Sequence, residues 1–293
     1  MRASKSRSRG DSASPTTAIA CVKALSSAAI VALVLAIIGL SQAFAQETST
    51  QGSPVKGQSP PPAAPSPWSF RVSPYLWIAG INGKVGVRSN IPAANVDVGF
   101  SDIFKALDWF PPPVMLGGEV RYGRFGFVSD FIYLGLEDSS GVTRGPISAK
   151  VDAHLNFAIW TFGGSYRVID NDPVTLDLLA GGRFWGLDGK STLTGPVAVR
   201  KGSGSDIWVD PIIGISGRVG LGSGFALQAE ADVGGFGLVS DIDWQVLGTL
   251  QYQVSDSFTM DAGYRYLAVD YKNGGFLLDA ALSGPIIGGS IRF

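Results

Sequence analysis

The sequence predicts an all-β fold, namely a transmembrane antiparallel up-and-down β-barrel, and three observations support this prediction. Apolar and polar residues alternate strictly in three segments near the end of the chain, 225–233, 242–254 and 258–266. A tilted strand needs roughly 9–11 residues to cross a bilayer, which suits the length of these segments. The chain also begins with the pattern of an export signal, and no long apolar run follows it although 45% of all residues are hydrophobic.

Residues 1–45 form the predicted export signal. Basic residues precede an apolar and small-residue stretch at 24–40, and Ala43 and Ala45 then supply the small-x-small pattern of a cleavage site. We therefore expect residues 1–45 to be removed during export. A retained membrane anchor is the alternative, because the apolar stretch is close to the lower length limit for a spanning helix.

The composition of the remaining chain excludes several classes of function. The signal contains five of the 23 Lys and Arg and one of the 24 Asp and Glu, which leaves 18 bases against 23 acids. This negative balance, without a basic run, argues against a nucleic-acid partner. The single cysteine, Cys21, lies in the signal, so disulfides and thiolate metal sites are excluded after cleavage. No cofactor motif or metal site is expected.

The barrel itself is expected to occupy residues 68–293. Residues 46–67 before it are rich in Pro, Ser and Gln without periodicity, which predicts a disordered spacer. Within the barrel, alternating segments are separated by clusters of turn-forming residues. The ten predicted strands are 68–78, 115–122, 125–136, 150–168, 174–187, 207–219, 225–233, 242–254, 258–271 and 276–293.

The connections between these strands alternate in length. The short turns fall at 123–124, 170–173, 222–224 and 255–257, whereas longer loops are expected at 79–114, 137–149, 188–206, 234–241 and 272–275. Bacterial barrels have short periplasmic turns, long external loops and an even number of strands. Four short turns with both ends of the barrel in the periplasm imply ten strands. Eight is the alternative if two weak segments at the front belong to loops.

One short helix is expected in the longest external loop, at 101–110. Its apolar residues recur at helical spacing, Ser101 is suited to cap it, and three prolines at 111–113 would end it. The apolar face must be buried against the barrel mouth, the lipid or a partner. The residues of this face are Phe100, Ile103, Phe104, Leu107 and Phe110.

Alternation also places a set of mixed charges on the inner face of the barrel. Acids and bases can pair across the lumen, and stranding a buried charge costs several kcal/mol. The set can act either as a salt-bridged filling of a narrow barrel or as the lining of a selective channel. Its members are Arg71, Glu119, Arg121, Asp130, Asp152, Asp177, Arg183, Asp210, Arg218, Glu230, Asp232, Asp261, Arg265 and Arg292.

Two parts of the sequence resemble known bacterial outer-membrane proteins. Ile287, Ile291 and Phe293 share one face of the last strand, and this ending resembles the terminal signature that the barrel-assembly machinery recognises. Segments 74–77, 97–107, 119–126 and 130–133 together resemble small barrels of the opacity-protein and porin-like kind. The resemblance implies an outer-membrane location with membrane lipid as a partner, and it provides no catalytic residues.

Three functions follow from these observations. The first is a non-enzymatic integral outer-membrane barrel with an envelope-structural or surface-interaction role. The second is a narrow passive channel lined by the mixed charges and gated by the loop helix. The third is an outer-membrane hydrolase that uses His154, the only histidine, with Asp152 on the same strand face. A lone histidine among polar lumen residues is more often structural. The sequence leaves the solute or external ligand open.

Overall fold

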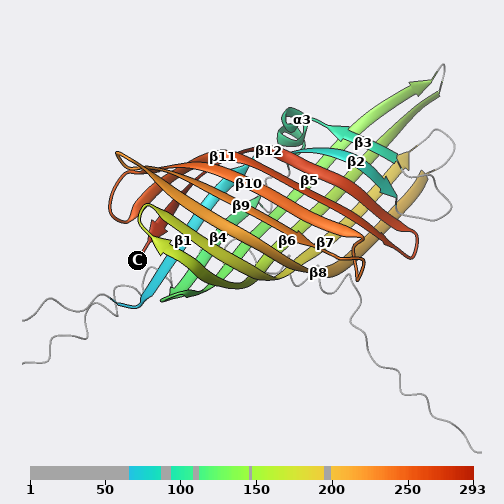
Figure 1. Ribbon diagram of the computed structural model, residues 1–293. Coiled ribbons are helices and arrows are strands. Elements are labelled where there is room, and N and C mark those ends of the chain that lie inside the picture. The colour runs from blue at the N-terminus through green and yellow to red at the C-terminus, as the bar shows by residue number, and fades with distance from the viewer. Residues whose placement is uncertain (1–65, 87–93, 108–111, 145–146, 195–198) are drawn as a thin grey trace, which may run out of the picture.

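A computed structural model describes residues 66–86, 94–107, 112–144, 147–194 and 199–293. Ten antiparallel strands form a barrel that is closed by pairing of its first and last strands (Figure 1). The prediction of ten strands is therefore confirmed, and the alternative of eight is wrong. These strands are β1 (Trp68–Trp77), β4 (Val114–Tyr122), β5 (Phe125–Arg144), β6 (Ile147–Asn171), β7 (Val174–Thr194), β8 (Val199–Gly222), β9 (Phe225–Gly234), β10 (Ile242–Gln253), β11 (Phe258–Asn273) and β12 (Phe276–Arg292).

The expected export signal and most of the expected spacer, including Ala43 and Ala45, lie outside the described residues. Of the spacer, the structure describes only positions 66 and 67. Here the Ser66 hydroxyl accepts a hydrogen bond from the Trp68 amide at 3.2 Å, and the Pro67 carbonyl accepts one from Gly123 at 3.1 Å. Within the described part of the chain, no helix is long and apolar enough to cross a membrane.

The segment 79–114, expected to be a loop with one helix, also contains two strands. β2 (Gly80–Gly86) continues β1 along β12, and β3 (Ala94–Val98) pairs with β2. The helix α3 (Phe100–Ala106) follows and contacts both β2 and β5. The alternation in β2 and β3 was missed because small and polar residues, such as Gly83 and Asn82 in β2, interrupt the apolar pattern.

Four neighbouring strands are much longer than expected. Segments 137–149 and 188–206 were predicted to be loops, but they largely continue β5, β6, β7 and β8. β5 and β6 remain paired beyond Glu137↔His154, and β7 and β8 remain paired beyond Asp188↔Ser205. The pairing of β8 with β9, in contrast, starts only at Ile212↔Gly234. We call the parts at 135–144, 147–156, 187–194 and 199–206 the projecting sheet (Figure 1).

The two ends of the barrel differ in their connections. The short turns lie at the same end as Trp68 and Phe293, and the Phe293 and Phe70 backbones exchange hydrogen bonds there at 3.0 and 3.3 Å. Gly123 in the first of these turns has φ = 56°, in the left-handed region that favours glycine. We call this the short-turn end, and the opposite end, which contains the projecting sheet and α3, the loop end.

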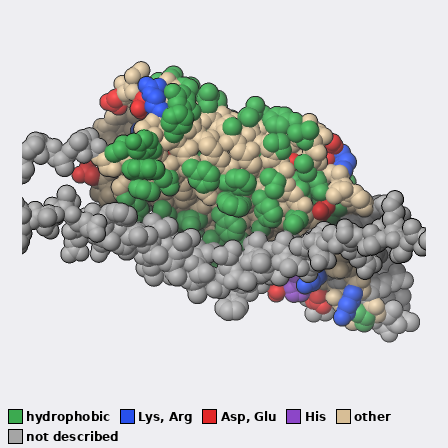
Figure 2. All heavy atoms as spheres, turned by 90° about the horizontal axis from the view of Figure 1, so that it is seen from below, with side chains coloured by type: hydrophobic (Ala, Val, Ile, Leu, Met, Phe, Trp, Pro, Cys, Tyr) green, Lys and Arg blue, Asp and Glu red, His purple; other side chains and the backbone are tan. Residues whose placement is uncertain are grey.

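The outward face of the barrel is apolar. Figure 2 shows hydrophobic side chains over a broad band of the visible face, with charged side chains gathered toward its two ends. Exposed aromatic rings pair on neighbouring strands at the short-turn end, for example Trp68 with Tyr122 at 4.9 Å and Phe225 with Tyr252 at 4.8 Å. An apolar band with aromatic residues at its border is typical of a lipid-facing barrel surface.

Close strand contact explains part of the high glycine content. Gly163 on β6 lies opposite Gly181 on β7. A Cβ atom at position 163 would lie 2.5 Å from the Ala180 carbonyl oxygen, and one at position 181 would lie 2.0 Å from that of Phe162. Only glycine fits the backbone where these strands coil so closely.

Candidate functional site

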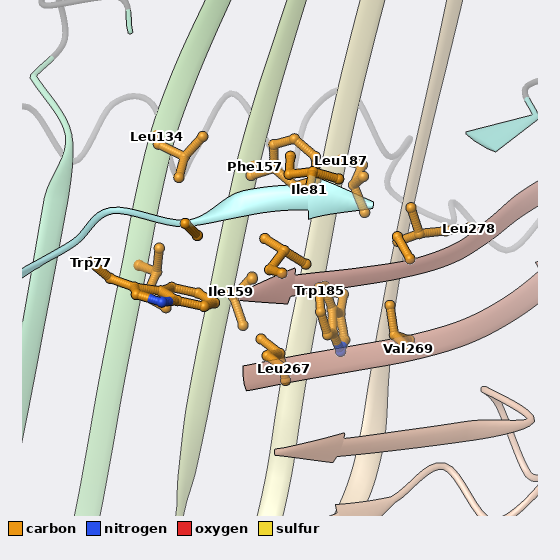
Figure 3. Close-up of a cluster of buried hydrophobic side chains, with 14 of the residues drawn as sticks. Trp77, Ile81, Leu134, Phe157, Ile159, Trp185, Leu187, Leu267, Val269 and Leu278 are labelled. Atoms are coloured by element: carbon orange, nitrogen blue, oxygen red, sulfur yellow. The ribbon is translucent and has the colours of Figure 1, made fainter. Parts of the chain in front are cut away.

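The lumen is the candidate functional site, and its lining changes from polar to apolar along the barrel. On β11 the inward face carries Asp261 and Arg265 toward the short-turn end, followed by Leu267 and Val269 toward the loop end. Figure 3 shows these last two side chains converging with others, such as Trp77 and Trp185, from several strands. The lumen thus has a polar half and an apolar half.

The apolar half is a packed core at the loop end. Trp208 stacks on Tyr271 with ring centroids 3.8 Å apart and on Trp185 at 5.8 Å. A small cavity with an almost wholly apolar lining lies next to this core, between Trp77, Ile132 and the helix residue Ile103. The barrel interior is therefore filled here by side chains, as barrels of similar size require.

At the boundary between the halves, Arg183 is fully buried. Its Nη2 donates to both oxygens of Asp232 at 2.9 Å, its Nη1 donates to Asp243 at 2.6 Å, and its Nε donates to the Thr161 hydroxyl at 2.9 Å. Trp185 donates a further hydrogen bond to Asp243 at 3.0 Å. A buried guanidinium is tolerated only with such paired, hydrogen-bonded carboxylates. These contacts tie β7 to β6, β9 and β10.

Arg265 is the second fully buried cation at this level. It forms an ion pair with Asp130 at 2.8 Å and donates to Gln245 at 2.8 Å and to the Tyr75 hydroxyl at 3.0 Å. Tyr75 in turn donates to Asp130 at 2.6 Å. The guanidinium carbon lies 4.9 Å from the centre of the Trp77 ring, within the range of a cation–π contact.

We call Arg183, Arg265 and the groups that they contact the middle layer. Gln245 links the two halves of this layer, because it accepts from Arg265 and donates to Asp232 at 3.1 Å. The layer connects strands on opposite sides of the barrel, from β1 and β5 across to β9 and β10. Its side chains occupy the lumen at this level, and a chamber in the polar half lies on the side of the short-turn end.

Beside the middle layer, Asp210 anchors a loop. It is fully buried, and it accepts hydrogen bonds from the backbone and the hydroxyl of Ser240 at 2.9 and 2.6 Å and from Trp208 at 2.9 Å. On the surface above, Lys272 forms ion pairs with Asp270 and Asp241 at 3.0 and 3.2 Å. Lys272 also donates hydrogen bonds to both carboxylates, and these bonds, the one to Asp270 having the larger effect, raise the pKa of Lys272.

The wall of the polar chamber near the short-turn end contains a second ionic network. Arg121 pairs with Glu119 at 2.5 Å and with Asp177 at 3.1 Å, and Arg167 binds both oxygens of Asp177 at 3.1 Å. Deeper in the chamber, Asp261 accepts hydrogen bonds from Gln251 at 2.9 Å and from Ser290 at 2.7 Å. A cavity of about 150 Å³ lies next to the Arg121 network and is also lined by Arg71 and Arg292.

The structure brings most of the predicted lumen charges into these layers, with one exception and several additions. Asp152 does not join them: it lies in the projecting sheet opposite Ser139, and even positions of β6 such as Trp160 and Tyr166 face outward. The residues that sequence reasoning missed include Arg167, Asp243 and Gln245. Each lies two positions from another inward-facing residue of its own strand. Alternation alone could therefore have identified all three.

His154 also lies away from the lumen, contrary to expectation. Its Nδ1 lies 2.8 Å from the Glu137 carboxylate in the projecting sheet, and the two side chains are 51% and 55% exposed. Asp152 shares this strand face, two positions along. Among the described residues, no group of three or more His, Cys, Asp or Glu is placed to hold a metal ion.

The loop helix is shorter than expected and begins earlier. Its N-cap is Gly99, without a side-chain cap, in place of Ser101. It ends at Ala106, and the C-cap residue Leu107 forms a bridge with Leu136 of β5. Ile103 is buried in the apolar core, whereas Phe100 is 58% exposed and so does not belong to the buried face. The Phe104 side chain and residue Phe110 lie outside what the structure describes. The helix segment therefore packs against the apolar core through Ile103 and the following Leu107, between β2 and β5.

On the last strand, Ile287, Ile291 and Phe293 all have exposed side chains, as residues of one outward face do.

The fold and its lumen thus define a class of protein: a ten-stranded transmembrane β-barrel of the outer-membrane type, with a lumen crossed by side chains.

Comparison with solved structures agrees with this class. The outer membrane protease OmpT from Escherichia coli superposes with a TM-score of 0.51 at 11% identity, over 81% of this chain and 99% of that one. The translocator domain of the autotransporter NalP from Neisseria meningitidis gives 0.47 at 12% identity, over 90% and 98%. The attachment invasion locus protein Ail of Yersinia pestis gives 0.29 at 16% identity, over 78% and 99%. The superposition on OmpT confirms the predicted resemblance to outer-membrane barrels, at the level of the fold alone. No protein-family model and no curated protein matches the chain.

Proposed function

We propose that this protein is a non-enzymatic, non-conducting barrel of the outer membrane that acts in surface interaction through its projecting sheet. The observation that carries the proposal is the middle layer. Two fully buried arginines, Arg183 and Arg265, are fixed by carboxylates from opposite walls. A solute could pass only if buried ion pairs were broken, and removing one partner of such a pair costs about 3–5 kcal/mol.

The projecting sheet supplies the interaction surface in this proposal. Membrane crossing needs only about 9–11 residues per strand, but β5 to β8 have 20, 25, 21 and 24 residues. The excess residues continue as paired strands beyond the lipid. Long external segments on a rigid barrel are typical positions for binding function.

Export, assembly and orientation complete the proposal. Residues 1–45 direct export and are cleaved, and residues 46–67 join the cleavage site to the barrel. Ile287, Ile291 and Phe293 present the terminal signature to the barrel-assembly machinery. The short-turn end then lies in the periplasm and the projecting sheet lies outside the cell.

Cysteine labelling on intact cells tests this arrangement. Lys190 lies exposed in the projecting sheet, and Asp256 lies exposed in the short turn between β10 and β11. A membrane-impermeant maleimide should label Lys190→Cys on intact cells and Asp256→Cys only after permeabilisation, with the unsubstituted protein as the blank. The reverse pattern would contradict the proposed orientation and remove the projecting sheet from the cell surface.

A narrow channel is the second candidate, because a water-accessible chamber occupies the polar half of the lumen. Uptake of small sugars into liposomes that contain the purified barrel would favour it. An enzymatic role is tested separately. Peptide or lipid turnover that disappears in His154→Ala, with the barrel still folded, would contradict the non-enzymatic proposal.

A further inference from the structure

Three arginines at the short-turn end have an unusual arrangement. Arg71 on β1 lies directly opposite Arg292 on β12 in the strand pairing, and both face the lumen. Arg218 on β8 lines an adjoining cavity, which shares Arg71, Arg121 and Arg167 with the cavity at Arg292. Like charges placed opposite one another on paired strands destabilise a sheet. The fold therefore gathers positive charge at this mouth at a cost.

The carboxylates nearby are already engaged. Glu119 accepts two hydrogen bonds from Arg121 through one oxygen, and its other oxygen lies 3.5 Å from Arg71. Asp177 binds Arg167 through both oxygens and Arg121 through one of them. Both carboxylates are therefore already paired, Glu119 with Arg71 and Arg121 and Asp177 with Arg121 and Arg167.

The remaining guanidinium groups retain unused donors. Arg218 donates through Nε to the Gln251 amide oxygen at 2.9 Å, and in the described part of the chain neither Arg218 nor Arg292 has a carboxylate within ion-pair distance. A guanidinium has five N–H donors, so most of these remain available. Arg292 lines the cavity of about 150 Å³, whose lining contains four arginines and one carboxylate, whereas Arg218 lines the adjoining cavity.

We propose that this cavity is a binding site for an oxyanion of the phosphate type. Guanidinium groups recognise phosphate through paired, charge-assisted hydrogen bonds, and a bound anion would offset the repulsion between Arg71 and Arg292. Ser69 and Phe70, near the start of β1, form part of the lining, so the anion enters from the short-turn end. The middle layer blocks further passage, and the site is therefore a pocket and no part of a transport path.

The phosphate can come from either of two sources. It can be a free phosphate or phosphomonoester in the periplasm, or the headgroup of a phospholipid in the adjacent leaflet. Both present anionic phosphate oxygens to the arginines, and binding of different probes distinguishes them.

The test uses the purified, folded barrel in a zwitterionic or non-ionic detergent without phosphate. Isothermal titration with inorganic phosphate at constant ionic strength should give saturable binding. Arg292→Gln and Arg71→Gln should each weaken it roughly tenfold or more, since both arginines line the cavity and each substitution removes charge-assisted hydrogen bonds. Arg124→Gln is the matched control, because Arg124 lies exposed in the turn at the same end, outside the cavity lining. It should bind like the parent protein.

Stability provides a second readout that does not depend on measuring affinity. Without phosphate, Arg292→Gln should unfold at a temperature equal to or above that of the parent, because it relieves like-charge repulsion. Addition of phosphate should raise the unfolding temperature of the parent protein more than that of Arg292→Gln. Absence of phosphate binding by the parent, or equal binding by the parent and both lumen variants, would overturn the proposal. So would a loss of stability in phosphate-free Arg292→Gln.

The source of the phosphate is decided by a third titration. Short-chain phosphatidylglycerol below its micelle concentration is compared with inorganic phosphate. Tighter binding of the lipid, weakened by Arg292→Gln, identifies a headgroup, whereas binding of free phosphate at least as tight identifies a soluble anion. Lipid binding that is indifferent to Arg292→Gln counts against the site.

Discussion

Replacing Arg183 by alanine tests the role of the middle layer most sharply. Arg183 is fully buried and bonded to Thr161, Asp232 and Asp243, so its removal leaves two carboxylates without their cation. Breaking a buried pair in this way costs about 3–5 kcal/mol. We expect the free energy of unfolding to fall by this amount, measured by urea titration in detergent with folded and unfolded barrel separated by gel mobility.

Two further variants isolate the electrostatic cause. Adding Asp232→Asn and Asp243→Asn to Arg183→Ala removes the stranded charges and should recover part of the lost stability. Arg124→Ala, an exposed arginine with one hydrogen bond to a backbone carbonyl, should cost less than about 1 kcal/mol. If the triple variant is no more stable than Arg183→Ala, or if Arg183→Ala costs no more than Arg124→Ala, the reasoning is refuted.

Three other predictions concern the wall and the helix. Leu250→Lys should prevent assembly, because Leu250 faces lipid, where a lysine costs about 2–4 kcal/mol. Thr249→Lys should assemble, because Thr249 lines the polar chamber. Similar folding yields for the two variants would disprove this assignment of lipid-facing and lumen-facing residues. Gly163→Ala should destabilise the barrel because its Cβ would meet backbone 2.5 Å away, but Gly164→Ala has nothing within 4 Å and should be tolerated, as urea titration of both would reveal. Ile103→Ser should remove roughly 1.5–3 kcal/mol of burial and make 94–107 protease-sensitive while the barrel keeps its gel mobility; unchanged proteolysis would argue against the helix as a cover.

The barrel strands could be predicted because lipid imposes a strict rule on them. A residue such as Leu250 must be apolar on the lipid side, and Gln251 beside it is free to be polar, so the sequence alternates wherever the wall crosses the membrane. Beyond the membrane, water contacts both faces and the rule ends. The projecting sheet, rich in glycine and serine at 201–205, therefore looked like a loop although its backbone pairs in register.

The candidate site was predictable in composition more than in arrangement. Alternation placed Arg183, Asp232 and Arg265 inward, but pairing across the lumen depends on the stagger of ten strands, which a single sequence does not reveal. Arg183 contacts Asp243, 60 positions away. His154 was misplaced for another reason. The even positions of β6, such as Trp160, face outward, and His154 shares that face and contacts Glu137 in the projecting sheet. The helix start at Gly99 was missed because backbone geometry, without a side-chain cap, begins the helix.

Single-channel recording in planar lipid bilayers tests the central claim most directly. The claim is that the middle layer around Arg183 and Arg265 closes the lumen of the folded barrel. Purified protein that is inserted and verified as folded should produce no stable conductance steps in salt solution over a wide range of voltages. Steady, ohmic steps that recur in independent insertions would show an open path through the middle layer and contradict the account.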